Sequence, residues 1–229
     1  MPETKAQTDE HPIIFSGWSI RRILAGEKVQ TRRVVKPQPE KIGADVWAYK
    51  GLTFYDDEAM RSRLFCEAYR GEYPYGTANQ MWVREAFRLP EWADDISPSE
   101  YVKDDRFVKG TPPVRFVRFE ADGRATPFYD YVTEEGWGRK RSPIHMPRAL
   151  CHYVLRVESV RVERLLDISE DDAMAEGVKP VTRRSASVHG GDTISAVIAF
   201  KERWNEVHGS GAWQKNPWIW VISFSKIDE

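Results

Sequence analysis

Two stretches that are predicted to form β-strands constrain the fold of this chain more than any other feature. HYVLRVESVRVERL spans residues 152–165, and NPWIWVISF spans residues 216–224. The first alternates apolar and polar residues, which places the apolar side chains on one face of a strand, and the second would place Trp218, Trp220, Ile222 and Phe224 on a single side. In the first stretch the alternation slips near Ser159, as it does at a bulge or bend. We expect one long bent strand or two strands there, at a barrel corner, and a closing strand at 216–224.

Two helices are predicted from their capping residues. Ser169 precedes three acidic residues that suit the positive end of a helix dipole, and Gly177 is expected to end that helix. Asp192 is expected to cap a second helix that ends near Gly209. Its apolar stripe is formed by Val197, Phe200, Trp204 and Val207. Strands without regular β-α-β alternation predict an α+β fold, a small, partly open β-barrel with short flanking helices.

The chain of 229 residues, 41% of them hydrophobic, is long enough for one core. We expect a disordered tail at residues 1–11 and a single domain at 12–229. MWVREAF, at 81–87, alternates as a strand. Residues from 89 onward are rich in acids and prolines, which predicts a loop-rich insertion or flexible lid at about 89–141.

Charge and composition exclude several classes of protein. With 34 basic and 35 acidic residues, the chain lacks the basic field of a protein that coats nucleic acid. Cys66 and Cys151 have no metal-ligand spacing, and no phosphate- or dinucleotide-binding motif is present, so neither a metal nor a cofactor is expected. The polar N-terminus and the absence of long apolar runs predict a cytoplasmic protein with no membrane partner.

The stretch ILAGEKVQTRR, at 23–33, contains the first candidate site. A lysine whose pKa is lowered by burial can deprotonate a threonine hydroxyl, which makes Lys28 and Thr31 a candidate base and nucleophile. The alternative is an exposed turn in which Thr31 fills a strand position. Arg32 and Arg33 suit either a phosphate-facing patch or a solvated face.

Glu176 is the second candidate, because an acid in the last turn of a helix opposes the helix dipole by about 0.3 to 1 kcal/mol. A functional role would explain its position, and so would an exposed helix end where the penalty is screened. Trp213 and Trp218 are expected to be the more exposed tryptophans, on which a base can stack. His145 is interpreted as structural or pocket-lining.

Taken together, these motifs resemble the ASCH domain family of the PUA-like superfamily. The resemblance rests on ILAGEKVQTRR, on VRVERLLDISEDDAMAEGV from residue 160 and on NPWIWVISF. With MWVRE and IHMPR between them, the chain is especially similar to the longer ASCH proteins common in bacteriophages and prophages. The resemblance covers residues 13–36 and 142–226 and, only in patches, the middle of the chain.

The resemblance implies a PUA-like barrel with a cleft for a nucleobase or RNA. One branch of the family removes the acetyl group from N4-acetylcytidine, and its catalytic trio is similar to Lys28, Thr31 and Glu176. Lys28 would then deprotonate Thr31, Thr31 would attack the acyl carbonyl, and Glu176 would bind or protonate the leaving amine. An ion pair with Glu176 would, however, raise the pKa of Lys28 and weaken it as a base.

Two further functions remain open at this point. In the first, the protein is a non-catalytic module that binds RNA or a modified base, with Arg32, Arg33, His145, Trp213 and Trp218 in contact with phosphates and bases. In the second, a phage protein acts through a host protein partner.

Overall fold

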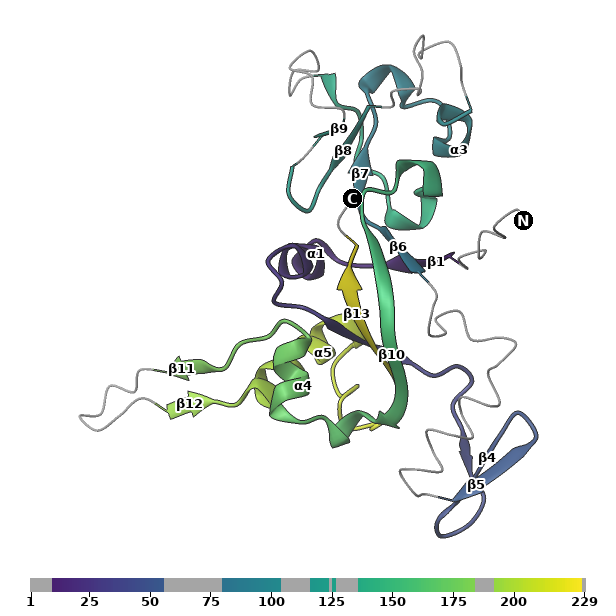
Figure 1. The fold of residues 1–229 in the computed structure, drawn as a ribbon, viewed down its shortest axis with the longest axis vertical. Helices are drawn as coiled ribbons and strands as arrows, with labels where there is room; N and C mark the ends of the chain where they lie inside the picture. Colours follow the sequence, from purple (N-terminus) through teal and green to yellow (C-terminus); the bar gives the residue numbers. More distant parts are fainter. Residues whose placement is uncertain are drawn as a thin grey trace, which may run out of the picture. The chain divides into compact units, whose positions relative to one another are not determined.

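A computed structural model describes residues 10–55, 80–103, 116–123, 125–126, 136–183 and 192–227 (Figure 1). The helices and strands are β1 (Glu10–Ile14), α1 (Gly17–Leu24), β2 (Gln30–Val34), β3 (Glu40–Lys41), β4 (Val46–Tyr49), β5 (Leu52–Tyr55), β6 (Gln80–Arg84), β7 (Phe87–Arg88), α3 (Pro98–Tyr101), β8 (Val117–Phe119), β9 (Ala125–Thr126), β10 (Val154–Arg164), α4 (Glu170–Ala175), β11 (Val181–Arg183), β12 (Asp192–Ile194), α5 (Ala196–His208) and β13 (Trp218–Lys226). Short 3-10 turns occupy Glu91–Ala93, Pro143–His145, Arg148–Leu150 and Leu165–Asp167. The expected tail at 1–11 lies almost wholly outside the described residues.

Strands and helices are mixed, which confirms the predicted α+β class. Within the described ranges, the strands form four sheets, the largest with the order β1-β6-β10-β13-β2, and none of them closes into a barrel. The PUA-like barrel therefore stays a prediction. The contacts of the chain divide it into two compact units, which are described separately below.

Unit 1 comprises residues 1–24, 80–156 and 226–229. In it β1 is parallel to β6, and the first residues of β10 are antiparallel to β6. An apolar cluster joins the β7–β8 pair to the segment around Met146. Its buried members are Phe87, Leu89, Ala93, Tyr101, Val117, Phe119, Met146 and Leu150.

The region expected to be a loop-rich insertion contributes to this cluster. Leu89 and Ala93 are fully buried, and α3 begins with a capping box in which Ser97 and Glu100 bond each other's backbone N–H. In its described part, the 89–141 segment is therefore a packed structure and not a flexible lid. Its remaining residues lie outside the described ranges.

The strand expected at 81–87 is interrupted. β6 ends at Arg84 and β7 begins at Phe87, which pairs with Phe119 in β8. Between them the backbone N–H of Glu85 donates to Met146 Sδ at 3.4 Å. This contact removes Glu85 from the strand ladder, so one alternating sequence forms two strands in different sheets.

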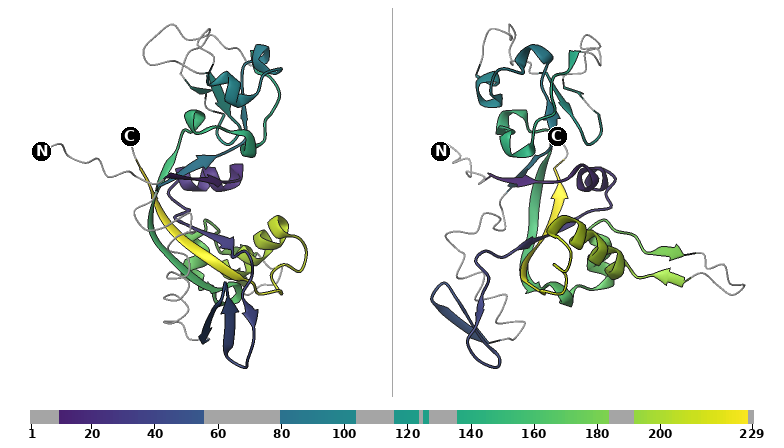
Figure 2. Two further views of the ribbon diagram at one scale, coloured as in Figure 1. Left: turned by 90° about the vertical axis from the view of Figure 1, so that its right-hand side faces the viewer. Right: turned by 180° about the vertical axis from the view of Figure 1, so that it is seen from behind.

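Unit 2 comprises residues 25–79 and 157–225, and it contains every candidate residue except His145. β2 is antiparallel to β13, with Thr31 opposite Ile222 and Arg32 opposite Val221. α4 and α5 pack against each other, as Figures 1 and 2 show, and α4 also contacts β2. These contacts set the ends of β2 and α4 side by side.

The long alternating sequence at 152–165 forms the single strand β10. Leu155 and Val157 are buried at odd positions, whereas Val162 is buried at an even position. The predicted slip of phase is therefore confirmed. Arg161 and Glu163 are two residues apart and so share one face of the strand. After the slip, this face is opposite to the one that carries the buried Val162.

The first predicted helix is confirmed, and the second begins differently from the prediction. Ser169 caps α4 by accepting a hydrogen bond from Asp172 N at 3.1 Å, and Gly177 follows it at φ 90°.

Asp192, which was expected to cap the second helix, lies in β12. Ser195 caps α5 in its place, because its hydroxyl accepts from Val197 N at 3.2 Å. The buried face of α5 does not include Val207, which was predicted to be part of its apolar stripe but is 61% exposed.

Candidate functional site

Lys28 and Glu176 meet where the chain enters β2 and leaves α4. Their backbones form an isolated β-bridge, and Val29 N donates to Ala175 O at 2.9 Å. The Lys28 ammonium donates to Glu176 Oε2 and, at 3.1 Å, to the backbone carbonyl of Glu176. The two side chains are only 3% and 6% exposed. Glu176 is thus held at the helix end by a buried cation.

Arg32 extends this pair into a network. Its Nη1 lies 3.4 Å from Glu176 Oε1, and its Nη2 lies 2.7 Å from Glu163 Oε1 and 3.2 Å from Asp172 Oδ2. The Arg32 side chain has no exposed surface. Gln30 accepts a further hydrogen bond from Arg32 Nη1 at 2.7 Å. A fully buried guanidinium is therefore surrounded by oxygen atoms from three elements.

Arg161 completes the network at its exposed edge. Its Nε donates to Glu163 Oε2 at 3.0 Å, and its Nη2 donates to Asp172 Oδ2 at 2.7 Å. The Arg161 side chain is 36% exposed, so the network runs from a buried end at Lys28 to a partly solvated end here. We call the following residues the ion network: Lys28, Gln30, Arg32, Arg161, Glu163, Asp172 and Glu176.

Strand and helix periodicities explain why these residues converge. Gln30 and Arg32 share one face of β2, as do Arg161 and Glu163 on β10. Asp172 and Glu176 are four residues apart, one turn of helix, and so lie on the same side of α4. Three elements thus turn their charged faces toward one another.

The electrostatics of the network favour a lysine with reduced proton affinity. Burial lowers the pKa of Lys28, and the charge and hydrogen bond of Glu176 offset this only in part. For Asp172, burial acts to raise the pKa, but the hydrogen bond and charge of Arg161 outweigh it, so the net pKa is lowered. The expected conflict between the ion pair and a basic Lys28 is therefore decided by burial.

Two buried N–H groups of the network, one on Lys28 and one on Arg32, have no acceptor among the described residues. A lysine ammonium has three N–H donors, and Lys28 finds its acceptors only on Glu176. The Nε of Arg32 is buried and makes no hydrogen bond within the described part of the chain. Because a buried unsatisfied donor costs about 1 to 3 kcal/mol, these two groups are suited to a ligand that brings acceptors.

Thr31 and Arg33 lie on the other face of β2. Consecutive strand residues point to opposite sides, so Thr31 faces away from the Arg32 guanidinium and shares its face with Ile222. Thr31 is 1% exposed, and no hydrogen bond of the described residues joins it to Lys28 or Glu176. The structure therefore unites Lys28, Arg32 and Glu176 but leaves Thr31 outside the ion network.

The remaining predicted residues differ from their expected exposure or lie elsewhere. Trp213 is 9% exposed and Trp218 has no exposed surface, so the prediction of two accessible rings is wrong. Trp218 packs edge-on against Trp47 and Phe54, with ring centroids 5.3 and 6.0 Å apart, and belongs to the core of unit 2. His145 is exposed in a 3-10 turn of unit 1.

Sequence reasoning missed Arg161, Glu163 and the structural role of Asp172. The first two follow the phase slip in the 152–165 stretch, which by itself indicates only a bend. Asp172 was assigned only to the dipole of α4. Counting the charged residues on each face after the slip would have identified the pair on β10.

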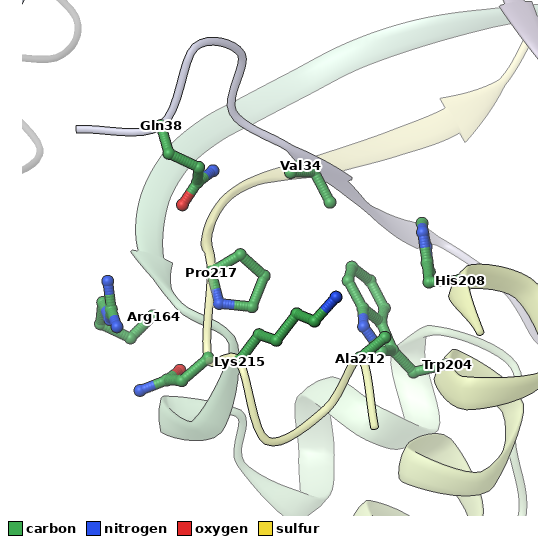
Figure 3. A pocket seen from close by; sticks show the side chains of 9 residues that line it. Val34, Gln38, Arg164, Trp204, His208, Ala212, Lys215 and Pro217 are labelled. Carbon is green, nitrogen blue, oxygen red and sulfur yellow. The ribbon is translucent and has the colours of Figure 1, made fainter. Parts of the chain in front are cut away.

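A cavity of about 360 Å³ lies elsewhere in unit 2 (Figure 3). None of the predicted site residues lines it.

No group of three His, Cys, Asp or Glu side chains suited to a metal ion is found in the described ranges. No helix there is long and apolar enough to cross a membrane.

Comparisons with family models, curated proteins and solved structures gave no match to this chain. The ASCH resemblance therefore stays a prediction that rests on the quoted motifs.

Proposed function

We propose that the protein recognises a nucleobase or nucleoside, free or within RNA, at the buried end of the ion network. The observation that carries this proposal is a pair of buried N–H groups, the third one of the Lys28 ammonium and that of Arg32 Nε, for which the described residues provide no acceptor. The edge of a base presents carbonyl and ring-nitrogen acceptors in one plane, and the Glu176 carboxylate beside the donors can accept from an exocyclic amine.

Energetics supports a recognition role over a purely structural one. Removing several charges from water costs several kcal/mol per ion, and apolar replacements of buried ion pairs are often as stable as the pair itself. A network with its donors incompletely satisfied is a poor stabilising device. Its donors and acceptors are, however, fixed in position before a ligand arrives, which lowers the cost of binding.

The binding proposal is tested by isothermal titration of the protein with cytidine, N4-acetylcytidine and a short single-stranded RNA. Glu176→Gln keeps the shape of the side chain but removes its charge, and Lys103→Gln, on an exposed lysine of unit 1, is the matched control. We expect Glu176→Gln to weaken binding about tenfold or more, as for a lost charge-assisted hydrogen bond, and Lys103→Gln to leave it unchanged. Equal affinities for the three proteins would refute the proposal.

Hydrolysis of an N4-acylated cytidine is the second candidate. Its support is the lowered pKa of Lys28, which suits a general base. The placement of Thr31 on the opposite face of β2 makes it a poor nucleophile for that base, so recognition without hydrolysis has the stronger support.

Chromatography of N4-acetylcytidine after incubation with the protein separates the two candidates. Release of cytidine that is lost in Thr31→Val would establish the hydrolase. Binding without turnover would leave recognition as the function.

A further inference from the structure

The cavity in unit 2 is a candidate second site. It is lined by Val34, Gln38, Arg164, Trp204, His208, Ala212, Lys215, Asn216 and Pro217 (Figure 3). Its volume of about 360 Å³ falls in the range of small-ligand pockets, about 300 to 1,000 Å³. The lining comes from the end of β2, the ends of β10 and α5, and the turn before β13.

The charge of this lining is entirely basic. Arg164 and Lys215 contribute cations and His208 an imidazole, while no aspartate or glutamate is among the nine residues. The Arg164 guanidinium is held over the rings of Trp47 and Trp218, 5.1 Å from each centroid. Within the described part of the chain, no ion pair uses Lys215. The cavity therefore favours an anion.

A further donor lies beside the cavity lysine. The indole Nε1 of Trp204 is buried and has no hydrogen-bond acceptor among the described residues. An indole N–H can only donate, and no acceptor of the described residues is within hydrogen-bond reach of it. Figure 3 shows the Lys215 side chain extending toward this indole. An oxyanion placed between the ammonium and the indole would accept from both.

Another part of the wall is apolar or aromatic. His208 stacks on Trp204 with ring centroids 4.0 Å apart, and Val34, Ala212 and Pro217 contribute no charge. Such a wall suits the sugar or base that carries an oxyanion better than a fully hydrated inorganic ion. The combination of basic donors with an apolar wall is the chemistry of a site for a phosphorylated nucleoside.

The cavity and the ion network are connected along one face of β2. Val34 and Arg32 are two residues apart on that face, about 7 Å along the strand. The Arg32 guanidinium lies 5.7 Å from the centroid of the Phe200 ring, which in turn packs against Trp204 at 5.9 Å. The cavity and the ion network are therefore neighbouring parts of unit 2, joined by packed side chains.

We propose that this cavity binds the phosphate group of a nucleotide through Lys215 and the Trp204 indole, in a lining to which Arg164 adds a second cation. Phosphate binding here does not require the proposed function, whereas the assignment of the phosphate to a nucleotide rests on it. The phosphate can belong to a free nucleotide or to the backbone of RNA, and the probes below distinguish these sources.

The test is isothermal titration with cytidine 5′-monophosphate, cytidine, inorganic phosphate and a short single-stranded RNA. Lys215→Gln removes a charge from an exposed side chain and leaves the fold intact, and Trp204→Phe removes the indole N–H but keeps a ring. We expect each variant to weaken binding of the monophosphate or of the RNA about tenfold, as for a lost charge-assisted contact, while cytidine binding is unchanged. Lys103→Gln is the control.

Each outcome of the titration bears on the proposal. A tenfold loss for the monophosphate assigns the site to a free nucleotide, and a loss for RNA alone assigns it to a polymer. Affinity that falls in Lys215→Gln but not in Glu176→Gln supports the cavity even if cytidine itself does not bind, and that result would reject only the proposed function. Unchanged affinity of both phosphate-bearing probes in Lys215→Gln would overturn the inference, as would the absence of any binding by them.

Discussion

Two buried glutamates, one in each unit, meet opposite surroundings. Glu176 is 5% exposed and faces the cations Lys28 and Arg32. Glu85 is 2% exposed, its Oε2 has no hydrogen-bond partner among the described residues, and the charge that acts on it is that of Asp122. Burial and the neighbouring acid raise the pKa of Glu85 to about 8.

The difference shows that burial alone does not decide what an acid does. Where the cations Lys28 and Arg32 are supplied from the chain at β2, the carboxylate becomes part of an ion network. Where an acid is buried beside another acid, its protonated form is favoured over the carboxylate. The free energy of unfolding then depends on pH. The predictions below test this contrast.

Breaking the ion network should have the largest effect. Glu176→Gln leaves Lys28 buried without a countercharge and should lower the free energy of unfolding by about 3 to 5 kcal/mol. The measurement is urea denaturation at pH 7. The double variant Lys28→Met/Glu176→Met should lose far less than the sum of the two single variants, because no charge is left unpaired. Additive losses would contradict the proposed coupling.

Glu85 should make unit 1 less stable as the pH rises. Its folded pKa of about 8 lies above its ordinary value of 4.5, so between these pH values the folded state keeps a proton that the unfolded state has released. Stability from this group is therefore fully present below about pH 4.5 and is lost as the pH rises to about 8.

Glu85→Gln should remove that dependence. At pH 8.5 the variant should exceed the wild type by about 2 to 4 kcal/mol, and at pH 4.5 the two should be nearly equal. Denaturant unfolding at both pH values measures this. Asp122→Asn should give a smaller gain, since burial remains the first cause of the shift. A constant difference between wild type and Glu85→Gln at all pH values would refute the assignment.

Arg161 should matter least, because it lies at the solvated edge of the ion network. Arg161→Gln should cost about 1 kcal/mol or less, and the loss should shrink in high salt as expected for a screened pair. Thermal unfolding at low and high salt checks this. A loss as large as that of Glu176→Gln would place the energetic centre of the network at its exposed edge.

Part of this contrast could be predicted from the sequence. The unfavourable position of Glu176 at a helix end indicated a compensating partner, and the structure provides one in Lys28. The Ser169 cap and the phase slip in β10 could also be predicted, because both follow from the local sequence pattern. The burial of Trp218 and the break at Glu85 were not, because each depends on contacts with residues distant in the chain.

The largest difference between the predicted site and the structure is the position of Thr31, which is explained by the face of β2 on which it lies. Lys28 and Thr31 are three residues apart, a spacing that joins them only if the chain turns between them. Pairing with β13 keeps residues 30–34 extended and so separates Thr31 from Arg32. A sequence pattern cannot fix this register, since it is set by a strand almost 190 residues later.

Thermal unfolding of the double variant Lys28→Met/Glu176→Met, with increasing N4-acetylcytidine or cytidine, tests the central claim most directly. A ligand that binds only the folded state raises the melting temperature of the protein, and the rise increases with the ligand concentration relative to its Kd. If the ion network is a recognition site, the wild type should be stabilised by one of these nucleosides, whereas the double variant, folded and of similar stability, should not respond. Equal stabilisation of both proteins, or no response from the wild type to any nucleoside, would contradict the claim.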